Sequence, residues 1–194
     1  IFSDLKGLSI TLPEPFKKTN TIEKDFILRG KIDNQRSHII DVKYGSDINS
    51  TILYKNGNLN SSINIGVAGN KIPNDGLVIN INNNEFNLDK WINFIKSTNT
   101  KSVHSNKNIE VNIKTRALIM VNRYFNDVDL QIRNKQDDIF TIINSPKTVG
   151  KLNLKKINNQ NFINANFKKL HINEAIIQKK IKKLPPSMNF TCTK

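Results

Sequence analysis

Residues 50–67 read Ser50-Thr51-Ile52-Leu53-Tyr54-Lys55-Asn56-Gly57-Asn58-Leu59-Asn60-Ser61-Ser62-Ile63-Asn64-Ile65-Gly66-Val67. This stretch predicts a β-hairpin, because Asn-Gly between two alternating segments tolerates the positive φ angles of a two-residue turn. The apolar residues of the second segment alternate with Asn and Ser; they are Leu59, Ile63, Ile65 and Val67. The pattern therefore indicates strands with one apolar and one polar face.

Alternating segments of this kind recur along most of the chain. We expect further strands at residues 22–31, 38–44, 77–81, 109–114, 117–121, 127–133, 138–143, 162–172 and 187–193. Their close spacing favours antiparallel pairing in sequence order. The predicted fold class is mainly β, an elongated, curled antiparallel sheet with the form of a groove or taco and one or two short helices. An ordinary β-sandwich is the alternative.

Two short helices are expected among the strands. Asp89 can cap the first, in which Trp91, Ile92, Phe94 and Ile95 form an apolar stripe at helical spacing. We interpret Trp91 as a structural anchor that plugs the end of a sheet. The second helix is basic and is expected at residues 174–183, between Asn173 and Pro185-Pro186.

The chain opens with a run that reads Ser3-Asp4-Leu5-Lys6-Gly7-Leu8-Ser9-Ile10-Thr11-Leu12-Pro13-Glu14-Pro15-Phe16-Lys17-Lys18. The alternation of Leu8, Ile10 and Leu12 with polar residues predicts a strand with one buried face. Pro13 and Pro15 should end this strand, because neither can donate a backbone N–H.

The length of 194 residues allows one sizeable core or two small ones. We treat residues 1–194 as one β-rich segment with a possible subdivision near residues 97–108, where the periodicity is lost. The chain does not begin with Met and contains no apolar run near the roughly 20 residues of a membrane-spanning helix. We therefore expect a soluble piece of a longer protein.

The net charge of +14 would ordinarily suggest an anionic partner. The lysines are spread along the chain together with many Asn and Ile residues, so we attribute much of the excess to the mutational bias of an AT-rich genome. The densest patch is a candidate contact for anionic headgroups and comprises Lys179, Lys180, Lys182 and Lys183, although a solvated helix face explains it equally well. Aromatic residues are sparse, and nucleic acid is not expected.

No constellation of catalytic residues is recognisable, so we expect neither an enzyme nor a bound cofactor. The three histidines, His38, His104 and His171, lie far apart in the sequence and have no partner at metal-ligand spacing. The single Cys192 is interpreted as a small buried side chain. No Gly-x-Ser-x-Gly elbow or glycine-rich phosphate loop occurs.

The opening run, the stretch from Gly76 to Trp91 and the stretch from Leu152 to Leu170 resemble the YhdP family of AsmA-like proteins. In that family a segment of the form SDLxGLxxxLPxPxxK precedes one of the form GLxVxGxxxxLDxDxW at about this separation. The chain departs from the second pattern at residues 80–84, where Asn is abundant and the family has Gly, and again in the helical stretch near residue 175.

This resemblance implies a long protein of the Gram-negative cell envelope, anchored in the inner membrane and extending through the periplasm. The β-rich body of such a protein forms a hydrophobic groove along which phospholipid moves towards the outer membrane. The resemblance thus implies that this chain is a periplasmic slice of the groove, with phospholipid as its partner. Contact with the membrane would come from parts of the protein outside this segment.

The candidate lipid groove is an apolar surface rather than a cluster of polar groups. Burial of an acyl chain contributes about 0.8 kcal/mol per CH₂, so a continuous apolar trough could hold a lipid. The candidate residues are Leu59, Ile63, Ile65, Leu77, Ile79, Ile81, Val111, Ile113, Val128, Leu130 and Ile132. Two alternatives stay open, namely a closed structural or adhesive β domain without ligand, and a domain that binds an anionic polymer through its lysines.

Overall fold

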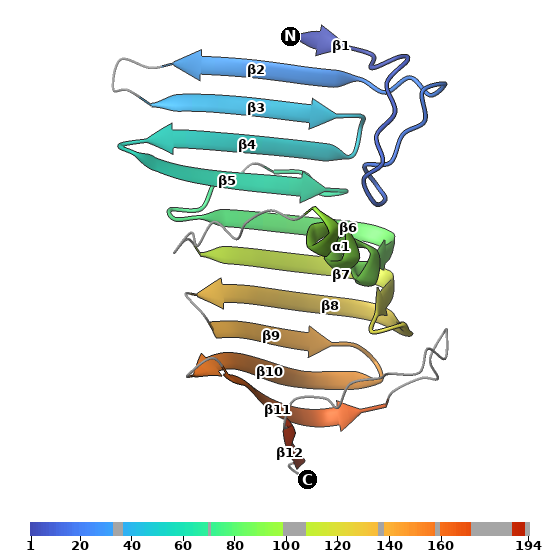
Figure 1. Cartoon of the computed structure of the whole chain (residues 1–194), viewed down its shortest axis with the longest axis vertical. Coiled ribbons are helices and arrows are strands. Elements are labelled where there is room, and N and C mark those ends of the chain that lie inside the picture. The colour runs from blue at the N-terminus through green and yellow to red at the C-terminus, as the bar shows by residue number, and fades with distance from the viewer. Residues whose placement is uncertain are drawn as a thin grey trace. The chain divides into compact units, whose positions relative to one another are not determined.

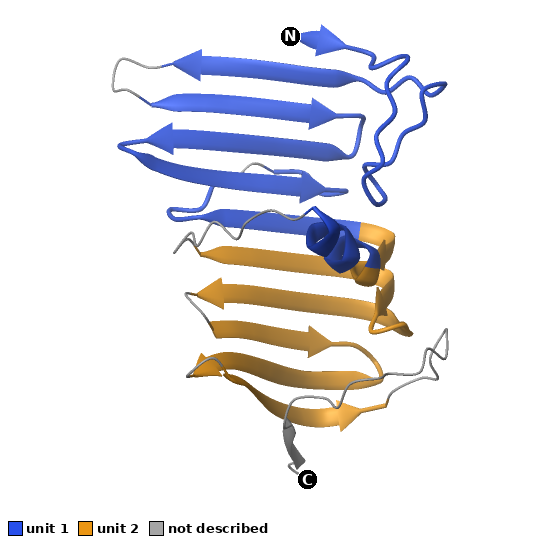
Figure 2. Ribbon diagram, in the orientation of Figure 1, with its two compact units in different colours: residues 1–82, 90–103 blue, residues 83–89, 104–194 orange. Residues whose placement is uncertain are grey.

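The computed structural model describes residues 1–32, 37–69, 71–98, 108–135, 138–157 and 160–171, and the backbone of residues 188–192. The chain divides into two compact units (Figure 2). Unit 1 comprises residues 1–82 and 90–103, and unit 2 comprises residues 83–89 and 104–194. Within each unit the strands follow one another in the sheet in the order of the sequence (Figure 1).

Unit 1 is built on a ladder of antiparallel strands. Its strands are β1 (Phe2–Ser3), β2 (Phe26–Ile32), β3 (His38–Tyr44), β4 (Ile48–Lys55), β5 (Asn58–Ile65) and the first half of β6 (Leu77–Asn87). The hairpin between β4 and β5 has φ angles of 52° at Asn56 and 79° at Gly57. These are the left-handed values that a type I′ turn requires, and the predicted hairpin is confirmed.

Strand β6 lies parallel to β5, with Ser61 opposite Leu77 and Ile65 opposite Ile81. The side chain of Asn60 fixes the end of the returning loop, because its Nδ2 donates to Asn74 O at 3.1 Å and its Oδ1 accepts from Gly76 N at 3.2 Å. The expectation of antiparallel pairing throughout is therefore wrong at this step. The eleven-residue connection, residues 66–76, lets the chain return to the start of β5 before it enters β6.

Unit 2 consists mainly of five strands, some of which are longer than the sequence predicts. They are β7 (Ile109–Met120), β8 (Arg123–Lys135), β9 (Asp138–Asn144), β10 (Thr148–Ile157) and β11 (Gln160–Leu170), all antiparallel. The two strands expected at 109–114 and 117–121 form one strand. The backbone of β12 (Met188–Cys192) pairs with β11 in parallel, which is a second exception to the antiparallel expectation.

One helix, α1 (Leu88–Ser97), occurs in the described residues and corresponds to the helix expected around Trp91. This helix is neither long nor apolar enough to cross a membrane. The basic helix expected at residues 174–183 lies outside the described residues, together with Lys179, Lys180, Lys182 and Lys183.

The strand expected at Leu8–Leu12 is absent from the structure, where only an isolated bridge joins Ile10 to Lys18. Leu8 is exposed, contrary to the expectation of a buried face. The physical reason is the turn after it, in which Phe16 N donates to Pro13 O at 3.0 Å. Pro13 and Pro15 have no N–H to donate, so the pairing of this segment with the returning chain is limited to the Ile10–Lys18 bridge.

The predicted fold class, mainly β with an open sheet and a short helix, is confirmed. The strands of each unit form a single layer, and no second sheet occurs among the described residues. The sandwich alternative therefore lacks the layer that it would need. In each unit one side of the layer is predominantly apolar. The other side, which we call the polar face, carries most of the polar side chains together with some apolar ones, such as Phe140 and Phe162 in unit 2.

Candidate functional site

The candidate residues of unit 1 lie in register on one face of the sheet. Ile63 is opposite Ile79, and Ile65 is opposite Ile81. The same face continues across β4, β3 and β2, because side chains that are directly opposite on neighbouring strands point to the same side. Its members there include Ile48, Ile52, Tyr54, Ile40, Val42, Tyr44, Phe26, Leu28 and Ile32.

The opposite face of unit 1 is polar and satisfies many of its own hydrogen bonds. Asn80 Nδ2 donates to Asn64 Oδ1 at 2.8 Å, and Asn64 Nδ2 donates to Ser62 Oγ at 3.0 Å. This amide chain runs across β5 and β6 on the side away from the isoleucines. The alternation of apolar and polar residues along β5 and β6 therefore separates an apolar face from a face whose side chains hydrogen-bond to one another.

The candidate residues of unit 2 also share one face of their sheet. Val111 is opposite Ile132, and Ile113 is opposite Leu130. The second pair extends through Ile143 and Gly150 to Phe167 on β11. The sequence thus places both groups of candidates on apolar faces, each within its own unit.

The exposure of these candidates varies along the strands. Ile65, Ile81, Ile113, Val128 and Leu130 are buried, whereas Ile63, Leu77, Ile79, Val111 and Ile132 are half-buried. Leu59 is 47% exposed and Ile32, at the same end of unit 1, is 75% exposed. In unit 1 the apolar face is therefore covered at one end of the strands and open at the other.

The covered end of unit 1 lies beneath residues 3–19, which we call the N-terminal clasp. Tyr44 at the end of β3 donates from its hydroxyl to Phe16 O at 2.9 Å, and the two rings stack with centroids 6.1 Å apart. Burial, and to a smaller extent the carboxylate of Glu14, raises the pKa of Tyr44 above its usual value. The clasp thus closes over the aromatic end of the sheet.

Lys18 holds the clasp together. Its Nζ donates to three carbonyl oxygens, those of Leu5 at 2.7 Å, Leu8 at 2.8 Å and Thr19 at 3.1 Å. Lys18 is only 3% exposed. Since an ammonium has three N–H donors, this arrangement satisfies each one in a site that water hardly reaches.

Trp91 of α1 contacts the clasp from the helix side. Its ring meets Phe16 edge to face with centroids 5.5 Å apart, and it meets Phe94 in the same way at 6.2 Å. The indole Nε1 also donates to Glu14 O at 3.1 Å. Trp91 therefore joins the helix to the clasp rather than lining the apolar face.

Asp89, which the sequence marks as a helix cap, lies instead in the first turn of α1, and its carboxylate binds a turn within unit 2. Its carboxylate accepts from Val121 N at 2.8 Å and from Asn122 N at 2.7 Å. Both turn residues have φ angles of 54°, and a β-branched residue such as Val121 rarely adopts that conformation. Asp89 therefore stabilises the strained turn between β7 and β8.

Sequence reasoning missed the carbonyl cage around Lys18 and the turn contact of Asp89. In the sequence Lys18 is one residue of a basic pair, Lys17-Lys18. The one sequence signal for the structure around it is Gly7, which suggests a tight turn earlier in the clasp. The described residues contain no group of three or more His, Cys, Asp and Glu side chains that could hold a metal ion. His38 stacks on Tyr54 with ring centroids 5.9 Å apart, whereas His104 lies outside the described residues.

The comparisons with known proteins identify a family. No curated protein and no solved structure matches the chain. The sequence model of the YhdP protein family matches residues 1–194, and this match spans the clasp, α1 and both apolar faces. The chain therefore belongs to the YhdP family, a family of envelope proteins.

Proposed function

We propose that this chain is a slice of a hydrophobic groove that binds phospholipid and conducts it between the inner and outer membranes of a Gram-negative envelope. The observation that carries the proposal is the open end of the apolar face in unit 1. There Tyr54 and Leu59 lie opposite each other on neighbouring strands, and both are exposed. Contiguous exposed apolar side chains on a protein surface mark sites that bind an apolar partner.

The chemistry of that face suits an acyl chain better than a polar ligand. A chain laid along the half-buried isoleucines would lose contact with water at about 0.8 kcal/mol per CH₂. The residues that the structure describes on this face of unit 1 include no Asp, Glu, Lys or Arg, so no single position there would hold the lipid tightly. A lipid could then move along the face in small steps of similar free energy.

Family membership supports the same proposal at a coarser level, because the family belongs to the cell envelope. We propose a periplasmic location for this segment. We also propose that contact with the membranes is made by other parts of the protein. The proposed role requires no catalytic group, and we propose that the chain is not an enzyme.

The first test is the presence of bound lipid in the purified chain. We expect phospholipid to co-purify with the folded protein and to be detected by mass spectrometry after extraction. A well-folded sample that carries no lipid and binds no hydrophobic dye would overturn the proposal in favour of a closed structural or adhesive domain. Salt-sensitive retention on heparin without lipid would instead favour an anionic polymer as the ligand.

A pair of substitutions on β6 separates an open face from a closed core. Ile79→Asp places a carboxylate on the apolar face, and Val78→Asp places one on the polar face at the next position; both residues are half-buried. We expect Ile79→Asp to reduce the lipid content several-fold while the sheet still folds, and Val78→Asp to leave the lipid content unchanged. Global unfolding by Ile79→Asp alone would indicate a sealed core, in which an unpaired carboxylate costs several kcal/mol.

A second pair of variants avoids buried positions altogether. Leu59→Asp alters the open end of the apolar face, and Asn58→Asp alters an exposed neighbour on the other face. Neither change should shift the midpoint of urea unfolding by much. We expect only Leu59→Asp to lower the amount of bound phospholipid, and equal lipid content in both variants would exclude this end of the face from the binding surface.

A further inference from the structure

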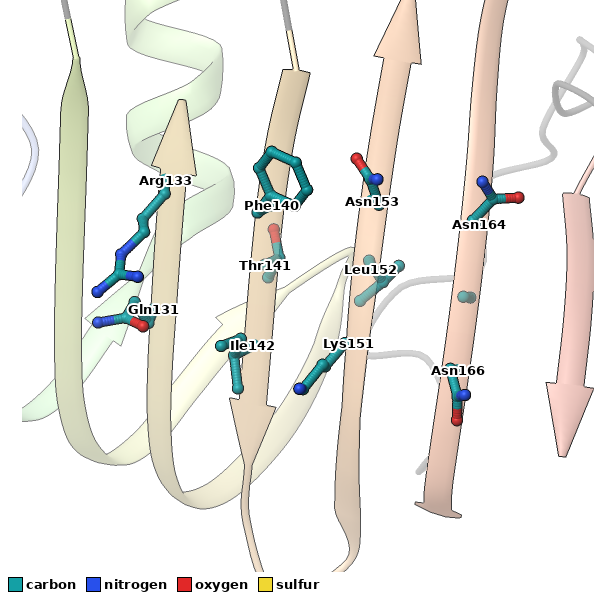
Figure 3. A pocket seen from close by; sticks show the side chains of 11 residues that line it. Gln131, Arg133, Phe140, Thr141, Ile142, Lys151, Leu152, Asn153, Asn164 and Asn166 are labelled. Atoms are coloured by element: carbon teal, nitrogen blue, oxygen red, sulfur yellow. The ribbon is translucent and has the colours of Figure 1, made fainter. Parts of the chain in front are cut away.

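The polar face of unit 2 contains a hollow of about 590 Å³ over β8, β9, β10 and β11 (Figure 3). Two rows of cross-strand neighbours floor it. One row includes Arg133, Phe140 and Asn164, and the other includes Ile142, Lys151 and Asn166. Along each strand these side chains alternate with those of the apolar face, which on β8 are Leu130 and Ile132. The hollow therefore lies on the side of unit 2 opposite its candidate lipid residues.

The charge in this hollow is not balanced. On the same face Glu110 pairs with Arg133 at 3.2 Å, Asp129 with Lys114 at 3.5 Å, and Asp138 with Lys155 at 3.5 Å. Lys151 is exposed and forms no ion pair or side-chain hydrogen bond with the described residues. Because the nearby carboxylates already have cations, the Lys151 ammonium is available to an anion.

The hollow also offers uncommitted amides. Asn164 and Asn166 are exposed and form no side-chain hydrogen bond with the described residues, and Asn153 Oδ1 is buried without a partner. Each amide can donate two hydrogen bonds and accept others. Gln131 is different, since its Nε2 already donates to Asn112 Oδ1 at 3.0 Å.

Apolar surface stands between these polar groups. Phe140 is 40% exposed and projects with Ile142 from β9 into the hollow (Figure 3). Phe162, on the same face of β11, is 39% exposed. An exposed ring beside free amides suits a ligand whose rings carry C–H groups on their faces and hydroxyl groups at their edges.

From these features we propose that the hollow binds a short acidic oligosaccharide. A sugar ring lies against Phe140, its hydroxyl groups hydrogen-bond to Asn164 and Asn166, and its acid group pairs with Lys151. The volume lies within the usual range for a small-ligand site. This site is separate from the proposed lipid face, so either proposal can fail while the other holds.

The test uses the 194-residue chain and two tetrasaccharides of equal length. We expect tetragalacturonate to bind in calorimetric titrations and to bind at least tenfold more tightly than neutral maltotetraose. Lys151→Gln should weaken binding of tetragalacturonate about tenfold, since one charge-assisted hydrogen bond is lost. Lys147→Gln removes the same charge from the β9–β10 turn, outside the hollow, and should change the affinity less than twofold.

Two further variants test the geometry. Asn166 lies directly opposite Lys151, so Asn166→Asp should neutralise the ammonium and weaken binding as much as Lys151→Gln does. Phe140→Ser should weaken binding of both sugars. Equal effects of Lys147→Gln and Lys151→Gln would overturn the proposal, because they would indicate diffuse charge attraction. Equal affinity for citrate and tetragalacturonate would also overturn the proposal, because the hollow would then bind anions without recognising a sugar.

Discussion

Trp91 Nε1 donates a hydrogen bond to Glu14 O across 3.1 Å, although the two residues are separated by 77 positions in the sequence. Glu14 lies in the opening motif, and Trp91 ends the second motif. Both belong to unit 1. The contact joins the two motifs, since one builds the clasp and the other supplies the helix that packs on it.

Trp91→Phe tests this contact. The substitution keeps a ring against Phe16 and removes the N–H donor, so we expect the free energy of unfolding to fall by about 1 kcal/mol. Ile95→Ala alters an exposed residue of the same helix and should change it by less than about 0.5 kcal/mol. Urea unfolding followed by circular dichroism measures both values, and equal effects of the two variants would contradict the role given to the indole.

Lys18→Met should destabilise the chain by about 3 kcal/mol. The thioether fills much of the same space but leaves three carbonyl oxygens of the clasp without their donors. Lys17→Met removes the same charge from the neighbouring exposed position and serves as the control. If the two variants unfold at the same urea concentration, Lys18 does not organise the clasp.

Two substitutions at the turn between β7 and β8 should change the free energy of unfolding in opposite directions. Asp89→Ala removes two charge-assisted hydrogen bonds and should lower the free energy of unfolding by about 2 kcal/mol. Val121→Asn replaces a strained β-branched residue with one that accepts a positive φ, and should raise it by about 1 kcal/mol. Thermal unfolding of the two variants checks the signs, and a loss of stability in Val121→Asn would argue against strain at this position.

Gly150→Ala should destabilise unit 2 by about 2 kcal/mol, because a methyl group has no room there. An added Cβ would lie 2.2 Å from Phe167 Cδ1 and 2.8 Å from the backbone oxygen of Asn166. Gly30 lies on the apolar face of unit 1 with no atom within 4 Å of an added Cβ, so Gly30→Ala should be neutral or slightly stabilising. Urea unfolding of both variants measures the difference, and a stable Gly150→Ala would mean that Phe167 moves aside freely.

Tyr44 should make stability depend on alkaline pH. Burial, and then Glu14, raises the pKa of the folded phenol above 10.0, so the unfolded chain loses that proton first as the pH rises. The contribution is fully present below pH 10 and is lost as the pH rises through the pKa of the folded state. We expect the stability advantage of the wild type over Tyr44→Phe to be constant from pH 7 to about pH 9 and to shrink above pH 10. An advantage that stays constant above pH 10 would contradict the shift.

The hairpin at Asn56-Gly57 and the division into two faces could be predicted because both depend on local rules. Turn residues fix the register, and alternation assigns each side chain to a face. The same rules failed at Leu8–Leu12. There the segment pairs through a single bridge and is held by the carbonyl contacts of Lys18, which no periodicity in the sequence reveals.

The parallel step between β5 and β6 was also beyond prediction. The loop composition at residues 66–76 indicates a break but does not say whether the chain reverses or returns. The hydrogen bonds of Asn60 to Asn74 and Gly76 hold the end of the loop beside the start of β5. One Asn in a chain with many carries no distinctive sequence signal. Likewise, the hollow beside Lys151 depends on pairings between four strands, which sequence alone does not specify.

The three carbonyl contacts of Lys18 have a practical consequence for chemical labelling. Amine-reactive reagents need a free, solvent-accessible nitrogen, and this ammonium offers neither. Lys17, one position earlier, is exposed and should react as an ordinary surface amine does. The extent of acetylation at Lys18 relative to Lys17 would therefore report how often the first nineteen residues detach from the sheet.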